Sequence, residues 1–185
     1  MQGYSAQDLA RSFRTVRKNT IRLAEDIPED KYGFRATPAV RSVAEMLAHI
    51  AVGTGWAQRM HGARLAFVDV AAFGAEMQRQ TQEETALKTK PQILDALRRN
   101  GDEFAAWLDT QSDDVLAERV GFPQPVEPSS RTRFEMLLSV KEHEMHHRAQ
   151  LMLVERLLGI VPHLTRDRQA AMAQRQQPHA QPQQA

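Results

Sequence analysis

Apolar residues recur at helical spacing in four segments of the chain, and this pattern restricts the fold more than any other feature. In the first segment the spacing alternates between four and three residues, as in the seam of a helical bundle, at Leu9, Phe13, Val16, Thr20, Leu23 and Ile27. We expect helices over about 5–26, 41–61, 91–109 and 133–158. No segment shows the alternating pattern of a strand. The sequence therefore predicts an all-α protein built as a four-helix bundle.

The ends of these helices carry recognisable signals. Ser5 with Asp8, and Thr132 with Glu135, have the spacing of capping boxes, and Gly159 is placed to end the last helix. The connections are long, however. We expect residues 63–88 to hold a short extra helix over one end of the bundle, and residues 110–131 contain three prolines.

Length and composition limit the domain plan and the partners. We expect one bundle domain over 1–162 and a Gln/Ala-rich tail over 163–185 that has too little apolar surface to fold. The chain has 24 Lys and Arg against 23 Asp and Glu, so its summed charge favours neither nucleic acid nor a membrane surface. With no signal segment and no long apolar run, we expect a cytoplasmic protein.

Three histidines lie within five residues of the last helix, and their neighbours separate them. One apolar stripe of this helix contains Met136, Val140, Leu151, Val154 and Leu158. At about 100° per residue, His143 and His147 fall in the same stripe, whereas His146 points away from it. Two imidazoles one turn apart on an inward face are typical of two ligands of a metal site.

The best third ligand is His49, which shares a helix face with Met46, Ile50 and Gly53. A single buried histidine more often forms a hydrogen bond to a carbonyl group than it coordinates a metal. Two histidines on one helix face, together with a third on the inward face of another helix, favour a metal site instead. The chain has no cysteine, so the ligands must be nitrogen or oxygen. We predict one divalent ion, zinc, nickel, iron or manganese, bound by His49, His143 and His147.

The other polar residues near this site receive weaker assignments. His146 is a reserve ligand expected at the surface, and Gln150 is placed to contact a ligand. Glu142 is expected to be solvated. Trp56 lies beside the His49 face, in a pocket or in the core. His61, His163 and His179 are expected in loops or the tail.

Two other metal sites share these residues. His143-Glu144-Met145-His146-His147 matches the HExxH motif, in which the glutamate is the base of a zinc metalloprotease and His163 would be the third ligand. That helix normally lies against a sheet, which the sequence does not predict. Glu144 and His147 also have the spacing of a di-iron bundle element, but that site needs a second such element and further inward glutamates.

Three segments together resemble the DinB-like family of metal-binding bundles, which includes bacterial transferases of small thiols. They are IPEDKYGFRATP (27–38), RSVAEMLAH (41–49) and HEMHHRAQL (143–151), within a resemblance that covers about 5–160. The resemblance implies an up-down-down-up bundle, a homodimer and a three-histidine site at His49, His143 and His147. The family usually has glycine where this chain has Ala149.

Two functions remain open. The first is a metal-dependent transferase or hydrolase of a small molecule, in which the ion makes a water or a small thiol nucleophilic. In thiol conjugation the sulfur would come from the substrate, because the chain has none in cysteine. The alternative is a stress-related dimer whose metal is structural or sensory. The sequence assigns no catalytic residue beyond the metal ligands.

Overall fold

The computed structural model describes residues 3–176, most of which are helical. The two strands are β1 (Arg119–Gly121) and β2 (Ser130–Thr132), and a single 3₁₀ turn, η1, covers Glu29–Lys31. The helices are α1 (Ala6–Asp26), α2 (Val43–Gly62), α3 (Val70–Ala86), α4 (Lys90–Asp109), α5 (Asp113–Ala117), α6 (Arg133–Leu157) and α7 (His163–Gln176). The all-α class is confirmed, and each of the four predicted helices is correct to within two residues at both ends.

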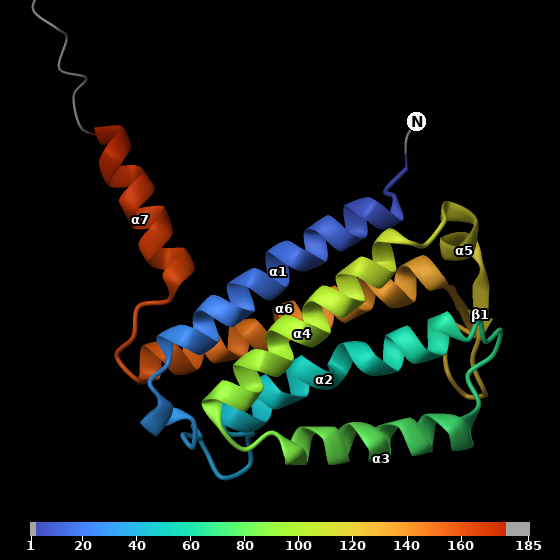
Figure 1. The fold of residues 1–185 in the computed structure, drawn as a ribbon, viewed down its shortest axis with the longest axis horizontal. Helices are drawn as coiled ribbons and strands as arrows, with labels where there is room; N and C mark the ends of the chain where they lie inside the picture. The colour runs from blue at the N-terminus through green and yellow to red at the C-terminus, as the bar shows by residue number, and fades with distance from the viewer. Residues whose placement is uncertain (1–2, 177–185) are drawn as a thin grey trace, which may run out of the picture.

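Helices α1, α2, α4 and α6 form the bundle. Both α1 and α2 pack against α4 and against α6, so α1 and α2 lie on one diagonal. The colours of Figure 1 show that α1 and α6 run in one direction and α2 and α4 in the other. This is the up-down-down-up arrangement expected from the family resemblance.

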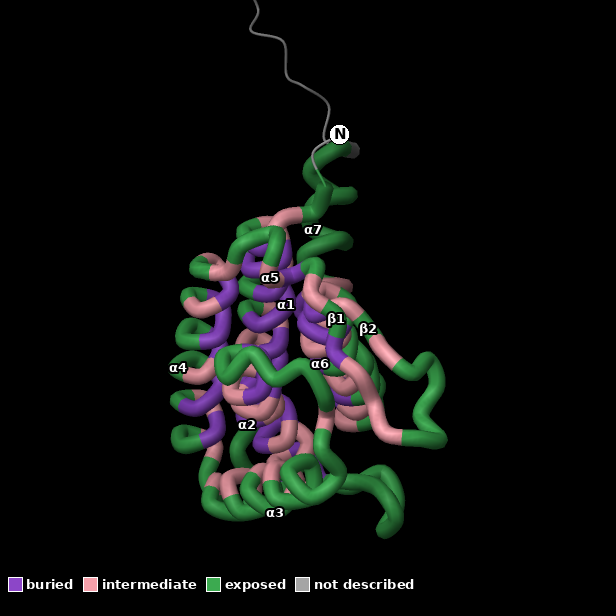
Figure 2. The backbone as a smooth tube through the Cα atoms, turned by 90° about the vertical axis from the view of Figure 1, so that its right-hand side faces the viewer, coloured by how far each residue is buried: buried purple, intermediate pink, exposed green. Residues whose placement is uncertain are grey.

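The predicted apolar seams form the core. Every member of the α1 seam from Leu9 to Ile27 is buried, and α4 contributes Leu97, Phe104 and Leu108. Figure 2 shows these buried faces turned inward along the bundle. Capping boxes fix four helix starts, because each N-cap side chain bonds a backbone N–H three residues on, and the residue there bonds back. The N-cap residues are Ser5, Ser42, Thr89 and Thr132.

The connection between α2 and α4 differs from the prediction. Instead of a short helix over a bundle end, the 17-residue α3 lies alongside α2, outside the bundle (Figure 1). Asp69 caps its first turn, and Glu76 forms a 2.6 Å ion pair with Arg59 of α2. None of the residues of α3 is buried, so polar contacts contribute much of its attachment.

The predicted absence of strands is wrong for six residues. Strands β1 and β2 pair antiparallel, with Arg119 opposite Thr132 and Gly121 opposite Ser130. Strands of three residues are too short for an alternating pattern to show in the sequence. The pair closes the segment between α5 and α6 and contacts α6 near its first turns, where Val120 of β1 packs with Met136.

Residues 163–176 of the expected tail form the helix α7 in this structure. His163 is buried at its first residue, and Asp167 and Arg166 form ion pairs with Arg22 and Asp26 of α1. These contacts hold the first turns of a helix that has little apolar surface. The rest of the expected tail, including His179, lies outside the described residues. Within 3–176, no helix has both the length and the apolar character needed to cross a membrane.

Candidate metal centre

The structure brings His49 of α2 together with His143 and His147 of α6. The Nε2 atom of His143 lies 3.1 Å from Nε2 of His49 and 3.0 Å from Nε2 of His147. One ligand atom from each of the three residues lies within 4.8 Å of the other two. At zinc–nitrogen bonds of about 2.0–2.1 Å, tetrahedral ligands would stand about 3.3 Å apart. The three nitrogens are thus close to the spacing that a single ion requires.

The centre lies at the edge of the bundle and not in its core. The sequence placed His143 and His147 in the buried stripe of α6, but His143 is exposed and His147 is half-buried. The buried face of α6 contains Leu137, Glu144 and Leu151 instead. Because each residue turns the helix by about 100°, His143 and His147 lie to one side of this face, toward α2. An ion held there would have one side open to solvent.

Hydrogen bonds on the outer nitrogens orient two of the rings. Nδ1 of His49 donates to Oε1 of Glu84 on α3 at 2.7 Å, because a carboxylate can only accept. Nδ1 of His147 donates to Oε1 of Gln150 at 2.9 Å. In neutral imidazoles, protons at these Nδ1 positions leave Nε2 with a lone pair. Both lone pairs would be available to a cation on the side where His143 approaches.

This arrangement fits a cation. Nε2 of His143 carries at most one proton, so it can donate to only one of the two neighbouring Nε2 atoms. At least one of the close nitrogen pairs therefore sets lone pair against lone pair. One cation bound by all three nitrogens replaces that repulsion with three favourable contacts. A carboxylate or amide oxygen behind a ligating histidine is the usual support in such sites.

The charge state of the rings also suits metal binding. Although part of the residue is exposed, partial desolvation of its ring, together with His147, His49, His146 and Arg41, lowers the pKa of His143 to about 4. Partial desolvation likewise lowers the pKa of His147, although the hydrogen bond that His147 donates to Gln150 acts in the opposite direction. Both rings are therefore neutral at pH 7, and no proton has to be removed before they bind an ion.

Two residues of α3 support the centre and were missed from the sequence. Glu84 accepts from His49, and Gln80 donates to the same carboxylate oxygen at 2.9 Å. Their only sequence signal is a spacing of four residues in a segment without a strong apolar pattern. Gln150, expected near a ligand, bonds His147 and also donates to His146 at 3.2 Å. His146 is exposed, as expected, and is not part of the cluster.

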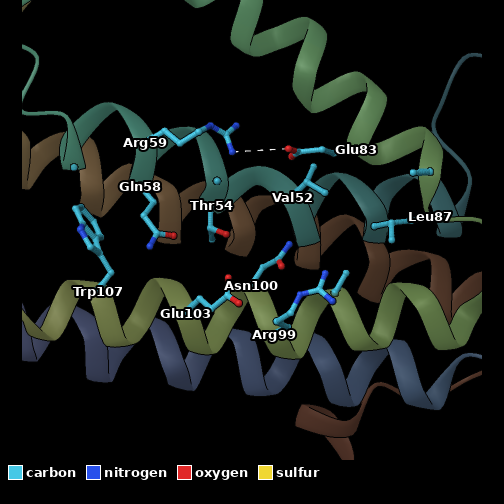
Figure 3. A pocket seen from close by; sticks show the side chains of 14 residues that line it. Val52, Thr54, Gln58, Arg59, Glu83, Leu87, Arg99, Asn100, Glu103 and Trp107 are labelled. Atoms are coloured by element: carbon cyan, nitrogen blue, oxygen red, sulfur yellow. Dashed lines mark ion pairs between the residues drawn. The ribbon is translucent and has the colours of Figure 1, made fainter.

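One cleft lies away from the three clustered histidines. It has a volume of about 750 Å³ between α2 and α4, near the end of α3. Figure 3 shows Thr54 and Gln58 of α2 facing Asn100 and Glu103 of α4 across it. A second cleft, of about 510 Å³, shares Glu84 with the histidine centre and is lined by Arg41 and Lys88. Of these two clefts, the second therefore offers a small molecule the shorter path to the three histidines.

Trp56, assigned to a pocket or to the core, lines an apolar cleft of about 330 Å³ beneath α3. Its indole ring meets the Phe73 ring edge-on, with 5.9 Å between the ring centroids. The cleft also includes Met60 and Val68, and none of the three clustered histidines lines it.

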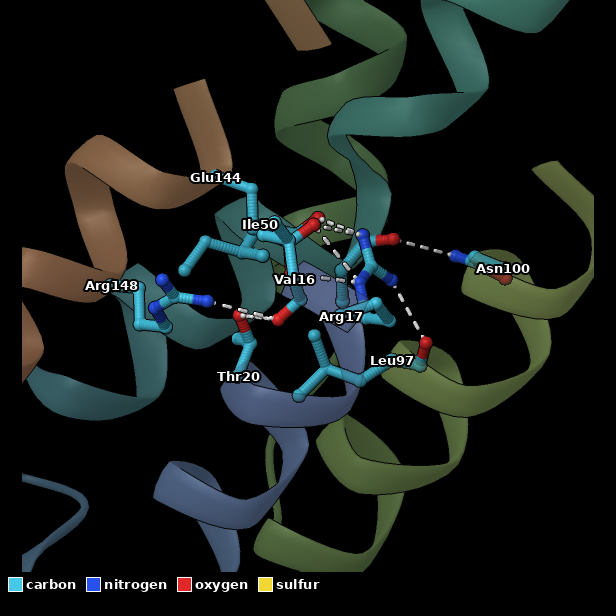
Figure 4. Close-up of polar contacts among 9 residues, drawn as sticks. Val16, Arg17, Thr20, Ile50, Leu97, Asn100, Glu144 and Arg148 are labelled. Atoms are coloured by element: carbon cyan, nitrogen blue, oxygen red, sulfur yellow. Dashed lines mark hydrogen bonds and ion pairs between the residues drawn. The ribbon is translucent and has the colours of Figure 1, made fainter. Parts of the chain in front are cut away.

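Glu144 points into the bundle core, toward Arg17 of α1 (Figure 4). It is buried and pairs with Arg17 of α1, with 3.0 Å between Nη2 and Oε2. A glutamate held there cannot serve as the base that the HExxH interpretation assigns to it. Nor can it share a metal with His147 as in a di-iron element. Neither the metalloprotease nor the di-iron site is therefore supported, because both need Glu144 at the metal.

His163 and His61 are also not where the sequence placed them. Both are buried, not loop or tail residues. His163 lies at the junction of α6 and α7, where its Nε2 is 3.4 Å from Oδ1 of Asn19. His61 lies in α2 beside Arg133, and burial with that positive charge lowers its pKa to about 4. Neither residue belongs to the cluster of His49, His143 and His147.

The comparisons with known proteins agree with this fold, and the family match spans the three histidines. The model of the DinB superfamily matches residues 12–151, a range that contains all three histidines. A crystal structure of the DinB-like protein YjoA from Bacillus subtilis superposes with a TM-score of 0.60, at 18% identity, over 82% of this chain and 92% of that chain. At this identity the match shows a shared fold. No curated protein matches this chain.

Proposed function

This chain belongs to the DinB superfamily, and we propose that it binds one divalent metal ion through His49, His143 and His147 and uses it in transfer or hydrolysis of a small molecule. The observation that carries the proposal is the meeting of the three imidazole nitrogens. Two of these rings are oriented from behind by Glu84 and Gln150. Zinc, nickel, iron and manganese are all compatible with a ligand set of nitrogens alone.

The ligand set supports catalysis because it leaves the ion reactive. Histidine ligands bring no negative charge, so the ion would keep its full positive charge, and no fourth His, Asp or Glu within the described range joins the cluster. Catalytic sites characteristically have three protein ligands and one open position. When bound, the ion would supply the charge that makes a water or a small thiol nucleophilic at neutral pH.

The chain's own groups have separate tasks in this proposal. Glu84 holds His49 with Nε2 facing the ion, and Gln150 does the same for His147. The exposed side of His143 leaves room for the substrate. The chain has no cysteine, so in thiol conjugation the attacking sulfur belongs to the substrate.

One observation favours a second function, a structural or sensory metal in a stress-related dimer. Neither the cleft of about 750 Å³ nor that of about 510 Å³ is lined by any of the three histidines. A sensory site needs no substrate pocket beside the ion. Exchange of a solvent ligand on the loaded protein separates the two functions, because a catalytic ion keeps an exchangeable position and a closed structural site does not.

The proposal is tested by metal content in three single variants. His49→Ala should lose most of the bound ion, because two remaining histidines hold a divalent ion far more weakly. His146→Ala and His163→Ala should keep it, since neither residue is in the cluster. Metal per chain is measured by native mass spectrometry after loading with zinc. Full occupancy in His49→Ala, or loss in His163→Ala, would show that the site is wrongly assigned.

We further propose that two copies pair through α6. Its outer face exposes Met145 and Leu153, with the small Ala149 between them. In an antiparallel pair with its two-fold axis at Ala149, Met145 faces Leu153 of the second copy, and Glu142 faces Arg156. Neither Glu142 nor Arg156 has an ion-pair partner within residues 3–176. The face is therefore complementary to itself in both apolar contact and charge.

A further inference from the structure

A single buried arginine on α1 bonds to the three other helices of the bundle. The side chain of Arg17 donates from Nε to both carboxylate oxygens of Glu144 on α6, at 3.1 Å each. It also donates from Nη1 to the carbonyl of Leu97 on α4 at 2.8 Å, and from Nη2 to the carbonyl of Ile50 on α2 at 3.3 Å. Figure 4 shows the guanidinium at the centre of these contacts. Arg17 is only 4% exposed.

Two of these partners directly follow residues of the histidine cluster. Ile50 comes after His49 in α2, and Glu144 comes after His143 in α6. From these contacts we infer that Arg17 is a positioning residue of the metal centre. It fixes the height and rotation of α2 relative to α6, and thereby the distance between His49 and His143. This inference rests on the proposed function, because Arg17 can affect metal binding only if the three histidines bind a metal.

Arginine is the side chain that this role requires. α1 and α2 lie on a diagonal of the bundle, so a residue of α1 must cross the core to reach the carbonyl of Ile50. The guanidinium has five donors in a fixed plane, so one group can bond two carbonyls and a carboxylate at once. A lysine ammonium has three donors and no fixed plane, and would not hold both helices in one geometry.

Stability alone does not account for this ion pair. Replacing a buried ion pair with well-packed apolar side chains is often neutral or stabilising. The Arg17 side chain also requires a glycine inside α4, because a Cβ at Gly101 would lie 2.8 Å from Cγ of Arg17. Glycine in a helix interior is itself unfavourable relative to alanine. A bundle that keeps both features gains one defined alignment of its helices, which is the attested use of buried polar groups.

The test separates alignment from stability with an apolar pair. The double variant Arg17→Met/Glu144→Leu removes both charges together and keeps similar side-chain volume. We expect it to fold with an unfolding midpoint close to that of the wild type, but to bind zinc about tenfold more weakly or worse, as when a supporting contact of a ligand is lost. The cobalt-loaded protein should also show an altered visible absorption spectrum, which reports ligand geometry.

Arg133→Met is the matched control. Arg133 is a buried arginine of α6 that bonds Glu118, His61 and the carbonyl of Leu65, none of which belongs to the cluster. Its loss should lower the unfolding midpoint and leave zinc affinity and the cobalt spectrum unchanged. If the double variant does not fold, Arg17→Lys gives the same comparison with the charge retained.

A second measurement on the metal-free protein makes the two proposals separable. The rings of His49 and His143 meet edge-on, with 4.9 Å between centroids, and should give a nuclear Overhauser contact that the double variant loses. Loss of this contact without any zinc binding by the wild type would overturn the proposed function and support the role of Arg17. Equal zinc affinity in the wild type and the folded double variant, with the ring contact kept, would overturn the role of Arg17.

Discussion

Glu84 should control metal affinity without controlling the stability of the fold. Its carboxylate accepts from Nδ1 of His49 at 2.7 Å, and the two side chains are 19% and 12% exposed. Glu84 lies on α3, which has no buried residue. We therefore expect Glu84→Gln and Glu84→Ala to weaken zinc binding while the bundle remains folded.

The size of the effect follows from the kind of hydrogen bond that is lost. A hydrogen bond to a charged group contributes about 1.5–3 kcal/mol, which corresponds to roughly 10- to 100-fold in affinity. Loss of a supporting contact to a ligating histidine costs about the same. The glutamine keeps an oxygen acceptor but not the charge, so Glu84→Gln should fall near tenfold. Glu84→Ala removes the acceptor and should approach a hundredfold.

Zinc affinity is measured by competition with a chromophoric chelator at pH 7.5, with thermal unfolding recorded on the same metal-free samples. Glu83→Gln is the matched control, because Glu83 is the neighbouring residue and lies 3.8 Å from Arg59, away from the histidines. It removes the same charge from the same turn. The control should bind zinc within about twofold of the wild type.

Two results would contradict this role of Glu84. If both Glu84 variants and the Glu83 control bind zinc as tightly as the wild type, the contact to His49 does not support a metal ligand. Equal weakening in Glu84→Gln and Glu83→Gln would point instead to the general negative charge of α3. Either outcome would remove the role given to this helix.

Two further predictions concern other parts of the chain. Burial and the nearby Asp26 raise the pKa of Glu155 from its ordinary 4.5 to about 7, so its stabilising contribution is present below pH 4.5 and is lost as the pH rises through 7. Glu155→Gln should therefore gain stability relative to the wild type by about 2 kcal/mol between pH 5 and pH 8, measured by urea unfolding; a constant difference would contradict it. Leu153→Lys should convert the proposed dimer to a monomer in light scattering, with Lys18→Gln as an exposed control, and a dimer of unchanged mass would exclude the α6 face.

The four bundle helices could be predicted because their signals are local. The spacing of Leu9, Phe13 and Leu23 marks one face, and the capping boxes at Ser5 and Thr132 mark the starts, each within a few residues of sequence. The direction of each helix was implied by the family resemblance and not by spacing.

The structure brings the three predicted histidines together, but in a different setting from the one that the sequence predicted. The sequence placed His143 in the core because most of its neighbours along the stripe are apolar. The core position belongs to Glu144, whose partner Arg17 lies 127 residues away. A charged residue is recognised as buried only once its partner is known, so periodicity assigned the wrong face.

The contribution of α3 could not be predicted because its sequence lacks a clear apolar pattern. Its residues bury no side chain, so no apolar period marks which face of α3 meets α2. The contact of Glu84 with His49 depends on how α3 is placed against α2. Likewise, α7 is held by ion pairs such as Arg22 with Asp167, which span long separations in sequence.

The loose attachment of α3 has a consequence for how the protein would respond to its ion. A helix that buries no residue fully and relies on contacts such as Arg59 with Glu76 and His49 with Glu84 is expected to open at a small fraction of the free energy of global unfolding. If the docked position of Glu84 favours the ion, the ion must favour the docked helix to the same extent, because the coupling is reciprocal. Metal concentration would then set how often α3 detaches, and amide hydrogen exchange over Val70–Ala86 would record it while the bundle core stays protected.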